Sequence, residues 1–188
     1  MVVEKVIEVL KRNGVVLMPS DTVPGLFARF NKSGMAALRK VKKRPEENPF
    51  LVVVPNREAL TKLVSNINDN ENKLIDEHWP GPLTIVFDKH ADVSSELTSG
   101  KDTVAVRYPE KELLNEVLNE LNEPLFSTSA NVSGDIVPER VTDVDDIIKM
   151  AVDMVVVDPE EPEDQVSSTI VRCDRYDVKV LRQGIITV

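Results

Sequence analysis

Short apolar runs that end at proline alternate with amphipathic segments along this chain. Residues 15–18 (Val-Val-Leu-Met) stop at Pro19, and residues 50–54 (Phe-Leu-Val-Val-Val) stop at Pro55. Runs of this kind are typical of buried strands, and proline cannot continue a ladder of backbone hydrogen bonds. Between such runs lie segments whose apolar residues recur at the spacing of one helix face. This alternation predicts an α/β fold in which helices cover a sheet.

The individual elements follow from the same two patterns. Helices are predicted over residues 3–13, from Ser33 to the stop at Pro45, and over 57–64, 70–77, 111–122 and 142–150, with Gly14, Ser33 and Thr142 as caps. Strands are predicted over 15–18, 50–54, 83–87, 103–106, 154–157, 168–173 and 178–181, and a buried strand also ends at Leu125-Phe126. No repeat or linker interrupts them. We therefore expect a single domain over residues 1–188, with a mixed twisted β-sheet covered by helices.

The composition indicates an ordinary globular protein. The 188 residues are 41% hydrophobic and 29% charged. No apolar run approaches the roughly 20 residues of a membrane helix, and charges interrupt the apolar pattern at the N-terminus, unlike a signal peptide. A single cysteine, Cys173, excludes an internal disulfide and a cysteine-rich metal cage. These features predict a cytoplasmic protein with no membrane association and no structural metal of its own.

The formal net charge of −9 argues against non-specific binding to nucleic acid, which depends on cations that meet phosphates. A local basic patch is still present. Lys40, Lys42, Lys43 and Arg44 form the densest cationic cluster, and Arg39 precedes them. A solvated helix end is the simpler interpretation of such a run.

Residues 124–134 (Pro-Leu-Phe-Ser-Thr-Ser-Ala-Asn-Val-Ser-Gly) are the strongest functional signal. Six of these eleven residues carry a hydroxyl or amide side chain or are glycine, and the segment follows a Leu-Phe pair that suits a buried strand. Buried hydroxyls and amides cost free energy unless they are paired, so the segment is poorly suited to a core. Small polar side chains and close backbone approach suit the binding of a phosphate or nucleotide.

Two further sets of cationic residues suit anionic ligands. Lys42 and Arg44 precede the helix-stopping Pro45, so both side chains can turn toward one site from an exposed helix end. Together they could hold a triphosphate, or they could be an ordinary basic helix terminus. Arg107 follows a predicted strand, where it could clamp a carboxylate or form a surface salt bridge.

In order along the chain, these segments resemble the YrdC-like (TsaC) family of threonylcarbamoyl-AMP synthases. The resemblance begins at about residue 15 and continues to the C-terminus. The segments that carry it are 19–26 (PSDTVPGL), 42–45 (KKRP), 78–84 (HWPGPLT), 104–109 (VAVRYP), 124–134 (PLFSTSANVSG), 167–171 (SSTIV) and 181–184 (LRQG).

The resemblance implies a role for each matching residue. Lys42 and Arg44 would face the ATP phosphates, and Ser129 and Asn131 would donate to phosphate and carbamate oxygens; these four residues are the expected catalytic group. Thr22, in a segment that reads as a turn by composition alone, and Arg107 would hold threonine. Ser127 and Ser133 would support the site. Ser168, Thr169 and Arg182 would reach the nucleotide, although the first two are also ordinary strand residues.

The implied reaction joins L-threonine, bicarbonate and ATP, with Mg²⁺ entering as part of the ATP, and releases pyrophosphate. The product would pass to a tRNA-modifying transferase complex for modification of adenosine 37, and tight intrinsic binding of tRNA is not expected. Two alternatives stay open: an RNA-binding module of the same fold, and a paralogous nucleotide-handling carbamoyl-transfer enzyme. Pro24, Gln165 and Arg172 depart from the family pattern. The acidic, proline-containing segment 158–164 is predicted to be a solvated loop.

Overall fold

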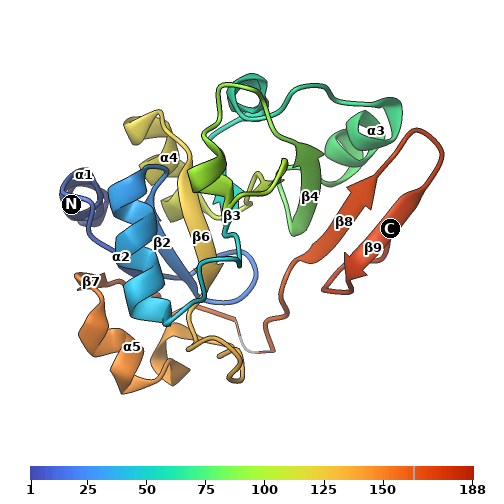
Figure 1. Ribbon diagram of the computed structural model, residues 1–188. Helices are drawn as coiled ribbons and strands as arrows, with labels where there is room; N and C mark the ends of the chain where they lie inside the picture. The colour runs from blue at the N-terminus through green and yellow to red at the C-terminus, as the bar shows by residue number, and fades with distance from the viewer. Residues whose placement is uncertain (163) are drawn as a thin grey trace.

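The computed structural model describes residues 1–162 and 164–188. Across these residues one nine-stranded sheet runs through the protein in the order β7-β1-β2-β6-β3-β5-β4-β8-β9 (Figure 1). The strands are β1 (Val16–Met18), β2 (Gly25–Arg29), β3 (Leu51–Val53), β4 (Leu83–Asp88), β5 (Thr103–Arg107), β6 (Leu125–Ser129), β7 (Met154–Val155), β8 (Thr169–Cys173) and β9 (Val178–Arg182). The pairs β1/β7, β3/β5 and β4/β8 are parallel and the other neighbours are antiparallel, which confirms the predicted mixed sheet.

Helices and short 3₁₀ turns connect these strands. The helices are α1 (Val2–Lys11), α2 (Lys32–Lys42), α3 (Asp69–His78), α4 (Glu112–Leu121) and α5 (Asp146–Ala151), and the turns are η1 (Arg57–Lys62), η2 (Ser95–Thr98) and η3 (Val141–Asp143). Among the described residues, no helix combines the length and the apolar character that a membrane span requires.

The apolar residues separate into two clusters because successive strand side chains point to opposite faces of a sheet. Val16 and Met18 of β1 pack with the apolar faces of α1 and α4. Leu17 lies between them in the sequence and packs into the other cluster, which holds the buried side of α2. Helices therefore cover the sheet on two sides, as the sequence pattern predicts (Figure 1).

Strand β2 was missed by the sequence analysis, which ended its interpretation of this region at the turn before Gly25. The strand holds a central position between β1 and β6, and Leu26, Phe27 and Ala28 are fully buried. Its apolar run is short and directly follows Pro24-Gly25, so turn chemistry masked the strand signal.

The predicted caps were wrong in three places, each by one to three positions. Asn13, not Gly14, takes the left-handed conformation after α1, with φ of 62°. Asn31, not Ser33, caps α2 by accepting from the Gly34 N–H at 2.8 Å. Helix α5 begins at Asp146 with Asp145 as its cap, while Thr142 lies in the separate turn η3. Residues 57–64, predicted as a helix, form the 3₁₀ turn η1 over Arg57–Lys62.

The described residues of segment 158–164 form a largely exposed loop, as predicted, although two of its acidic side chains make specific contacts. Asp158 pairs with Lys111 at 2.7 Å. Glu161 is buried, and its Oε2 accepts from the Val141 N–H at 2.8 Å; burial raises the pKa of this carboxyl. Glu163 lies outside the described residues. These two contacts attach the loop to Lys111 and to the turn η3.

Candidate functional site

A cavity of about 300 Å³ collects polar side chains from segments that are far apart in the sequence. Its polar lining residues are Ser20, Thr22, Arg44, Arg107, Ser127, Thr128, Ser129, Ser167, Ser168 and Arg182. The apolar part of the lining comes from Val23, Pro49, Phe50, Leu51, Val86, Ala105 and Ile170. Hydroxyls and guanidinium groups beside an apolar wall are suited to a ligand that carries both an anionic group and an apolar or aromatic part.

Arg107 lies at the end of β5 and is held in the interior by the turn that follows β1. Its Nη1 donates to Thr22 Oγ1 at 2.8 Å, and its Nη2 donates to Ser20 Oγ at 2.9 Å and to Asp21 Oδ1 at 2.6 Å. Burial lowers the pKa of Arg107, and the negative charge of Asp21 opposes that shift. The surface salt bridge considered for Arg107 is excluded, since the side chains of the pair are 5% and 8% exposed.

Two buried polar atoms in this network lack partners among the described residues. They are Nε of Arg107 and Oδ2 of Asp21. Buried polar atoms without partners are rare in folded proteins and call for an explanation such as a missing ligand or water. The turn at residues 20–22 is therefore more than a chain reversal, because its side chains surround a guanidinium with spare hydrogen-bonding capacity.

Lys42 corrects the expectation of an exposed helix end. It is 2% exposed and does not line the cavity. Its Nζ donates to Ser129 O at 2.7 Å and Ser129 Oγ at 3.2 Å, and to Asn131 Oδ1 at 2.7 Å and Asn131 O at 3.0 Å. Burial, aided by the nearby charge of Arg44, lowers the pKa of Lys42 to about 8. The ammonium therefore joins the end of α2 to the segment that leaves β6.

The Ser-x-Asn pair is divided between two hollows. Ser127 and Ser129 are two positions apart in β6, on the same side of the strand, and both line the cavity. Asn131 does not line it; its Nδ2 donates to Asp135 O at 2.7 Å, and its Oδ1 accepts from Ser129 Oγ at 2.7 Å. Ser133 contributes its N–H to Lys42 O at 3.1 Å.

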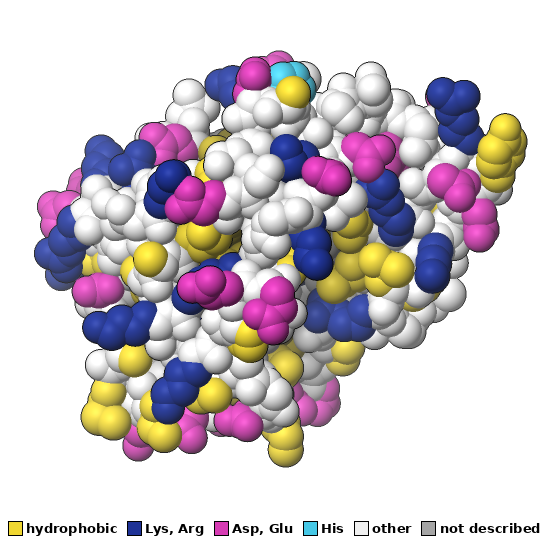
Figure 2. Space-filling view, in the orientation of Figure 1, with side chains coloured by type: hydrophobic (Ala, Val, Ile, Leu, Met, Phe, Trp, Pro, Cys, Tyr) yellow, Lys and Arg dark blue, Asp and Glu magenta, His cyan; other side chains and the backbone are white. Residues whose placement is uncertain are grey.

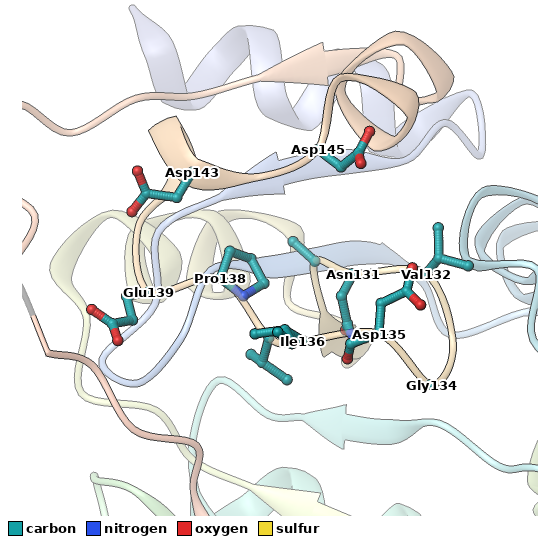
Figure 3. A pocket seen from close by; sticks show the side chains of 11 residues that line it. Asn131, Val132, Gly134, Asp135, Ile136, Pro138, Glu139, Asp143 and Asp145 are labelled. Atoms are coloured by element: carbon teal, nitrogen blue, oxygen red, sulfur yellow. The ribbon is translucent and has the colours of Figure 1, made fainter.

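Asn131 instead borders a second hollow of about 780 Å³, which is lined mainly by the loop that follows β6. Figure 3 shows Glu139, Asp143 and Asp145 at its margin, with carboxylates that point in different directions. Among the described residues, neither lysine nor arginine lines this hollow. A negative lining repels phosphates, so the smaller cavity is the better candidate for an anionic ligand.

Arg44 does line the cavity, and part of its guanidinium is already fixed. Nε donates to Asn48 O at 3.2 Å and Nη2 donates to Pro49 O at 2.8 Å. Within residues 1–162 and 164–188, Nη1 makes no hydrogen bond. Burial and the nearby charge of Arg39 lower the pKa of Arg44. Arg44 thus lines the cavity with one donor still unused, while Lys42 lies outside the cavity and already donates to four acceptors.

Arg182 reaches the cavity from β9 and is held by Ser168. Its Nη2 donates to Ser168 O at 2.7 Å and to Ser168 Oγ at 3.1 Å. The Ser168 hydroxyl is also 2.9 Å from Thr84 Oγ1, and both hydroxyls are buried. Burial lowers the pKa of Arg182, and the positive charge of Arg107 adds to that shift.

Thr169 lies outside the cavity lining. Its hydroxyl donates to Ile186 O and accepts from the N–H groups of Gly184 and Ile186 at 3.1 and 3.3 Å. Gly184 packs so closely that an added Cβ would lie 2.2 Å from Ser167 O. Thr169 and Gly184 therefore hold the C-terminal segment against β8.

The three residues that depart from the family pattern make contacts outside the cavity. Arg172 of β8 donates to Val86 O at 3.0 Å and pairs with Asp88 at 2.6 Å, so it joins β8 to β4. The carbonyl of Pro24 accepts from the Ala130 N–H at 3.0 Å. Gln165 donates weakly to Pro162 O at 3.4 Å. None of these three residues lines the cavity of about 300 Å³.

Asp21, Thr84 and the apolar wall were missed as site components. Asp21 read as a turn former, and its pairing with Arg107 depends on a contact between residues 86 positions apart. Thr84 is a single hydroxyl residue beside the apolar run of residues 85–87 in β4, so no polar pattern marked it in the sequence. In the part of the chain that the structure describes, no three histidine, cysteine or acidic side chains are grouped closely enough to hold a metal ion.

Comparisons with known proteins identify the family to which this chain belongs. The family Sua5/YciO/YrdC, described as "Telomere recombination", matches residues 8–184. The threonylcarbamoyl-AMP synthase of Pyrococcus abyssi is 30% identical over 176 residues, which are 93% of this chain and 52% of that relative. The threonylcarbamoyl-AMP synthase of Yersinia enterocolitica is 32% identical over 132 residues, 69% of this chain and 70% of that relative.

A solved structure is similar over almost the whole chain. The crystal structure of P. abyssi Sua5 complexed with L-threonine superposes with a TM-score of 0.89 at 28% identity, over 97% of this chain and 54% of that one. The chain spans about half the length of both P. abyssi relatives. Sequence and structure together place this chain in the Sua5/YciO/YrdC family.

Proposed function

We propose that this protein is a threonylcarbamoyl-AMP synthase, a nucleotidyltransferase that forms its product and pyrophosphate from L-threonine, bicarbonate and ATP. The observation that carries the proposal is the cavity itself, which brings Thr22 and Arg107 to the same space as Arg44, Ser129 and Arg182. Relatives that carry this activity in their names match most of the chain, and a similar structure was solved with L-threonine.

The chemistry that we propose needs no protein nucleophile. The threonine amine attacks bicarbonate, a C–N bond forms, and water leaves to give a carbamate. A carbamate oxygen then attacks the α-phosphorus of ATP, a new P–O bond forms, and pyrophosphate leaves with its electron pair. The protein contributes by holding the reactants together and by balancing the charge that develops on the phosphates.

The shared cavity supports the individual roles that we propose. The guanidinium of Arg107 and the hydroxyl of Thr22 hold the carboxylate end and the hydroxyl end of threonine. The free Nη1 of Arg44 and the hydroxyls of Ser127 and Ser129 meet phosphate and carbamate oxygens. Ser168 and Arg182 contact the nucleotide. Each of these seven side chains lines the cavity.

Lys42, Asn131 and Thr169 do not line the cavity, and we assign them to the support of neighbouring residues that do. Lys42 fixes the backbone carbonyls of Ser129 and Asn131, so its loss would displace the hydroxyl of Ser129. A direct contact between Lys42 and the triphosphate would require the ammonium to exchange some of these four acceptors for phosphate oxygens. Because Lys42 contacts Ser129, which lines the cavity, its charge can still act on phosphates bound there, since the interior screens it weakly.

Magnesium enters this reaction with ATP as part of the substrate. It prefers few carboxylates, several waters and substrate phosphates to a cage built by the protein. The product, an activated threonylcarbamoyl group, would pass to a tRNA-modifying transferase complex in the cytoplasm. The reaction itself has no step that requires tRNA to bind this chain.

Pyrophosphate release measured with all three substrates, and with each omitted in turn, tests the proposal. We expect release to require ATP, threonine and bicarbonate together. Release that ignores threonine but responds to carbamoyl phosphate would favour the carbamoyl-transfer alternative. A mass spectrum of the product separates the two, because only threonylcarbamoyl-AMP carries the mass of threonine.

The RNA-binding alternative has less support from the surface. Figure 2 shows Lys and Arg side chains interspersed with Asp and Glu over the viewed face, without one continuous basic area. The net charge is −9. Phosphate backbones bind where cations cluster, so this face is a poor platform for RNA.

A further inference from the structure

Arg39 lies in the last turn of α2, five residues before Arg44, and does not line the cavity, yet it organises the turn that follows α2. Its Nη2 donates to Glu46 O at 2.8 Å and to Ser99 Oγ at 2.7 Å. Its Nη1 donates to Asn48 O at 3.3 Å and also to Pro45 O. One guanidinium therefore ties three carbonyls of residues 45–48 to the hydroxyl of Ser99.

Arg44 is held by the same turn from its other side. Its Nε donates to Asn48 O, which is also the acceptor of Arg39 Nη1, so the two arginines share one carbonyl. The guanidinium carbons of both lie 5.2 Å from the ring centre of Phe50, a distance at which an aromatic ring attracts a cation. The Arg44 N–H also donates to Arg39 O at 3.2 Å.

The guanidinium groups of Arg39 and Arg44 repel one another because both are positively charged. Their shared contacts with the Phe50 ring and the Asn48 carbonyl offset that repulsion. The proximity of Arg39, after burial, lowers the pKa of Arg44. Nε and Nη2 of Arg44 both donate to carbonyls of the turn, and Nη1 of this cavity-lining residue keeps its hydrogen-bonding capacity.

We propose that Arg39 is a positioning residue, which fixes the turn at residues 45–49 so that Arg44 presents Nη1 to a nucleotide phosphate. This proposal rests on the proposed function for the nature of the ligand. The geometry favours arginine at position 39 because its planar fork divides four acceptors between two nitrogens, whereas a lysine must gather all its acceptors about one nitrogen. Its charge would be a secondary contribution, because Arg39 lies outside the cavity.

A double-mutant cycle on ATP affinity tests whether Arg39 acts through Arg44. The variants are Arg39→Met, Arg44→Met and the two combined, with the dissociation constant of ATP measured by calorimetry. We expect Arg39→Met alone to weaken ATP binding roughly tenfold, since small misplacements of a binding group are costly. In the Arg44→Met background the same change should cost less than about threefold, because residues that act as a unit are not additive.

Matched control variants separate the effect of the hydrogen bonds made by Arg39 from the effect of its positive charge. Lys40 and Lys43 are exposed and lie on the same helix end, so Lys40→Met and Lys43→Met remove the same charge without these contacts. Both should stay within about threefold of the unmodified protein. Arg39→Lys keeps the charge and loses the fork, and we expect it to resemble Arg39→Met. If Arg39→Lys binds ATP normally, or if the lysine variants match Arg39→Met, the contribution is charge alone and the proposal is wrong.

Hydrogen exchange of the Asn48 amide provides a measurement that does not depend on ATP. This N–H donates to Pro45 O at 3.2 Å, inside the turn that Arg39 holds. Its exchange should accelerate in Arg39→Met and Arg39→Lys but not in the lysine controls. An unchanged rate would overturn the positioning role even in a protein that binds ATP. Absence of ATP binding by the unmodified protein would refute the proposed function instead, and the exchange result would still decide whether Arg39 orders the turn.

Discussion

Arg107 and Asp21 form an ion pair in the interior, with Nη2 and Oδ1 2.6 Å apart and with side chains that are 5% and 8% exposed. Thr22 and Ser20 accept from the same guanidinium, so the turn after β1 surrounds it with oxygens. A pair this deeply buried is costly to separate, because the partner left behind keeps its charge without compensation. The relationship makes the turn at residues 20–22 part of the site.

Asp21→Asn is expected to destabilise the protein by about 3 kcal/mol, because it leaves the Arg107 charge unpaired in the interior. Adding Arg107→Met should recover part of that loss, since no unpaired charge then remains. Urea denaturation gives both values. Glu96→Gln is the control: it breaks the exposed pair with Lys32 and should cost less than about 1 kcal/mol. A loss for Asp21→Asn as small as that of the control would show that the pair contributes nothing unusual.

Replacement of Lys42 and of Arg44 should have different consequences. Lys42→Met leaves four oxygens without their buried donor, so we expect a loss of stability of about 2 kcal/mol or more, as well as slower turnover. Arg44→Met should change stability by less than about 1 kcal/mol and slow pyrophosphate release on the order of 100-fold. Denaturation midpoints and pyrophosphate release, measured on the same preparations, separate the two. Equal stability losses would contradict the structural distinction between these residues.

The low pKa of Lys42 predicts how stability changes with pH. The folded value is about 8, whereas an unfolded lysine titrates near about 10.4. Between these values the unfolded chain binds more protons than the folded chain, so the free energy of unfolding should rise with pH, by at most about 1.4 kcal/mol per pH unit. Lys42→Met should lack this contribution, and Lys40→Met should retain it. Parallel pH profiles for all three proteins would mean that the pKa is not shifted.

The sequence predicted the type of fold because its signals are local. Alternating apolar runs and amphipathic helices are visible in short windows, and the mixed sheet with helices on its faces confirms that prediction. Strand β2 was not predicted because its three apolar residues directly follow Pro24-Gly25. A strong turn signal next to so short an apolar run favours a turn over a strand. Cap positions also failed, because asparagines at positions 13 and 31 competed with the neighbouring glycine and serine that were chosen.

The site was harder to predict because its character depends on burial and pairing. The positions of Arg44, Arg107 and Ser129 were found from composition and family resemblance, and the cavity brings them together. That Lys42 would be buried beneath the site could not be read from a basic helix end. The carboxylate of Asp21 is equally invisible in sequence, because only the folded chain places it beside Arg107.

Binding of tRNA is expected to be weak at physiological salt. The chain carries a net charge of −9, and in its densest cationic segment Lys42 is buried and Arg44 lines the cavity. The exposed lysines of that segment, Lys40 and Lys43, are a small basic area on an acidic protein, and so few cations in one place displace few counterions from a phosphate backbone. Filter binding over a series of salt concentrations measures this. A steep salt dependence with tight binding near 150 mM salt would support the RNA-binding alternative.

Substrate choice tests the assignment of Thr22 and Arg107. A site built to pair a substrate hydroxyl rejects an analogue without it, because buried polar groups are then left unpaired. Serine lacks only a methyl group relative to threonine, worth about 1 kcal/mol in an apolar pocket, so it should react several-fold less well. Valine and 2-aminobutyrate should be at least about 100-fold poorer. Pyrophosphate release with each amino acid in turn gives this order.

Variants of Thr22 and Arg107 test which residue binds the hydroxyl of threonine and which binds its carboxylate. Thr22→Val removes the hydroxyl that accepts from Arg107 Nη1 and should weaken threonine binding, whereas Thr22→Ser should restore it. Arg107→Met is examined together with Asp21→Asn, so that no unpaired buried charge confuses the result. This double variant should bind ATP normally in calorimetry and lose threonine binding, because the carboxylate then has no cation to meet. Loss of ATP affinity with threonine binding intact would reverse the assignment of the two halves of the cavity, and Arg107 would belong to the nucleotide.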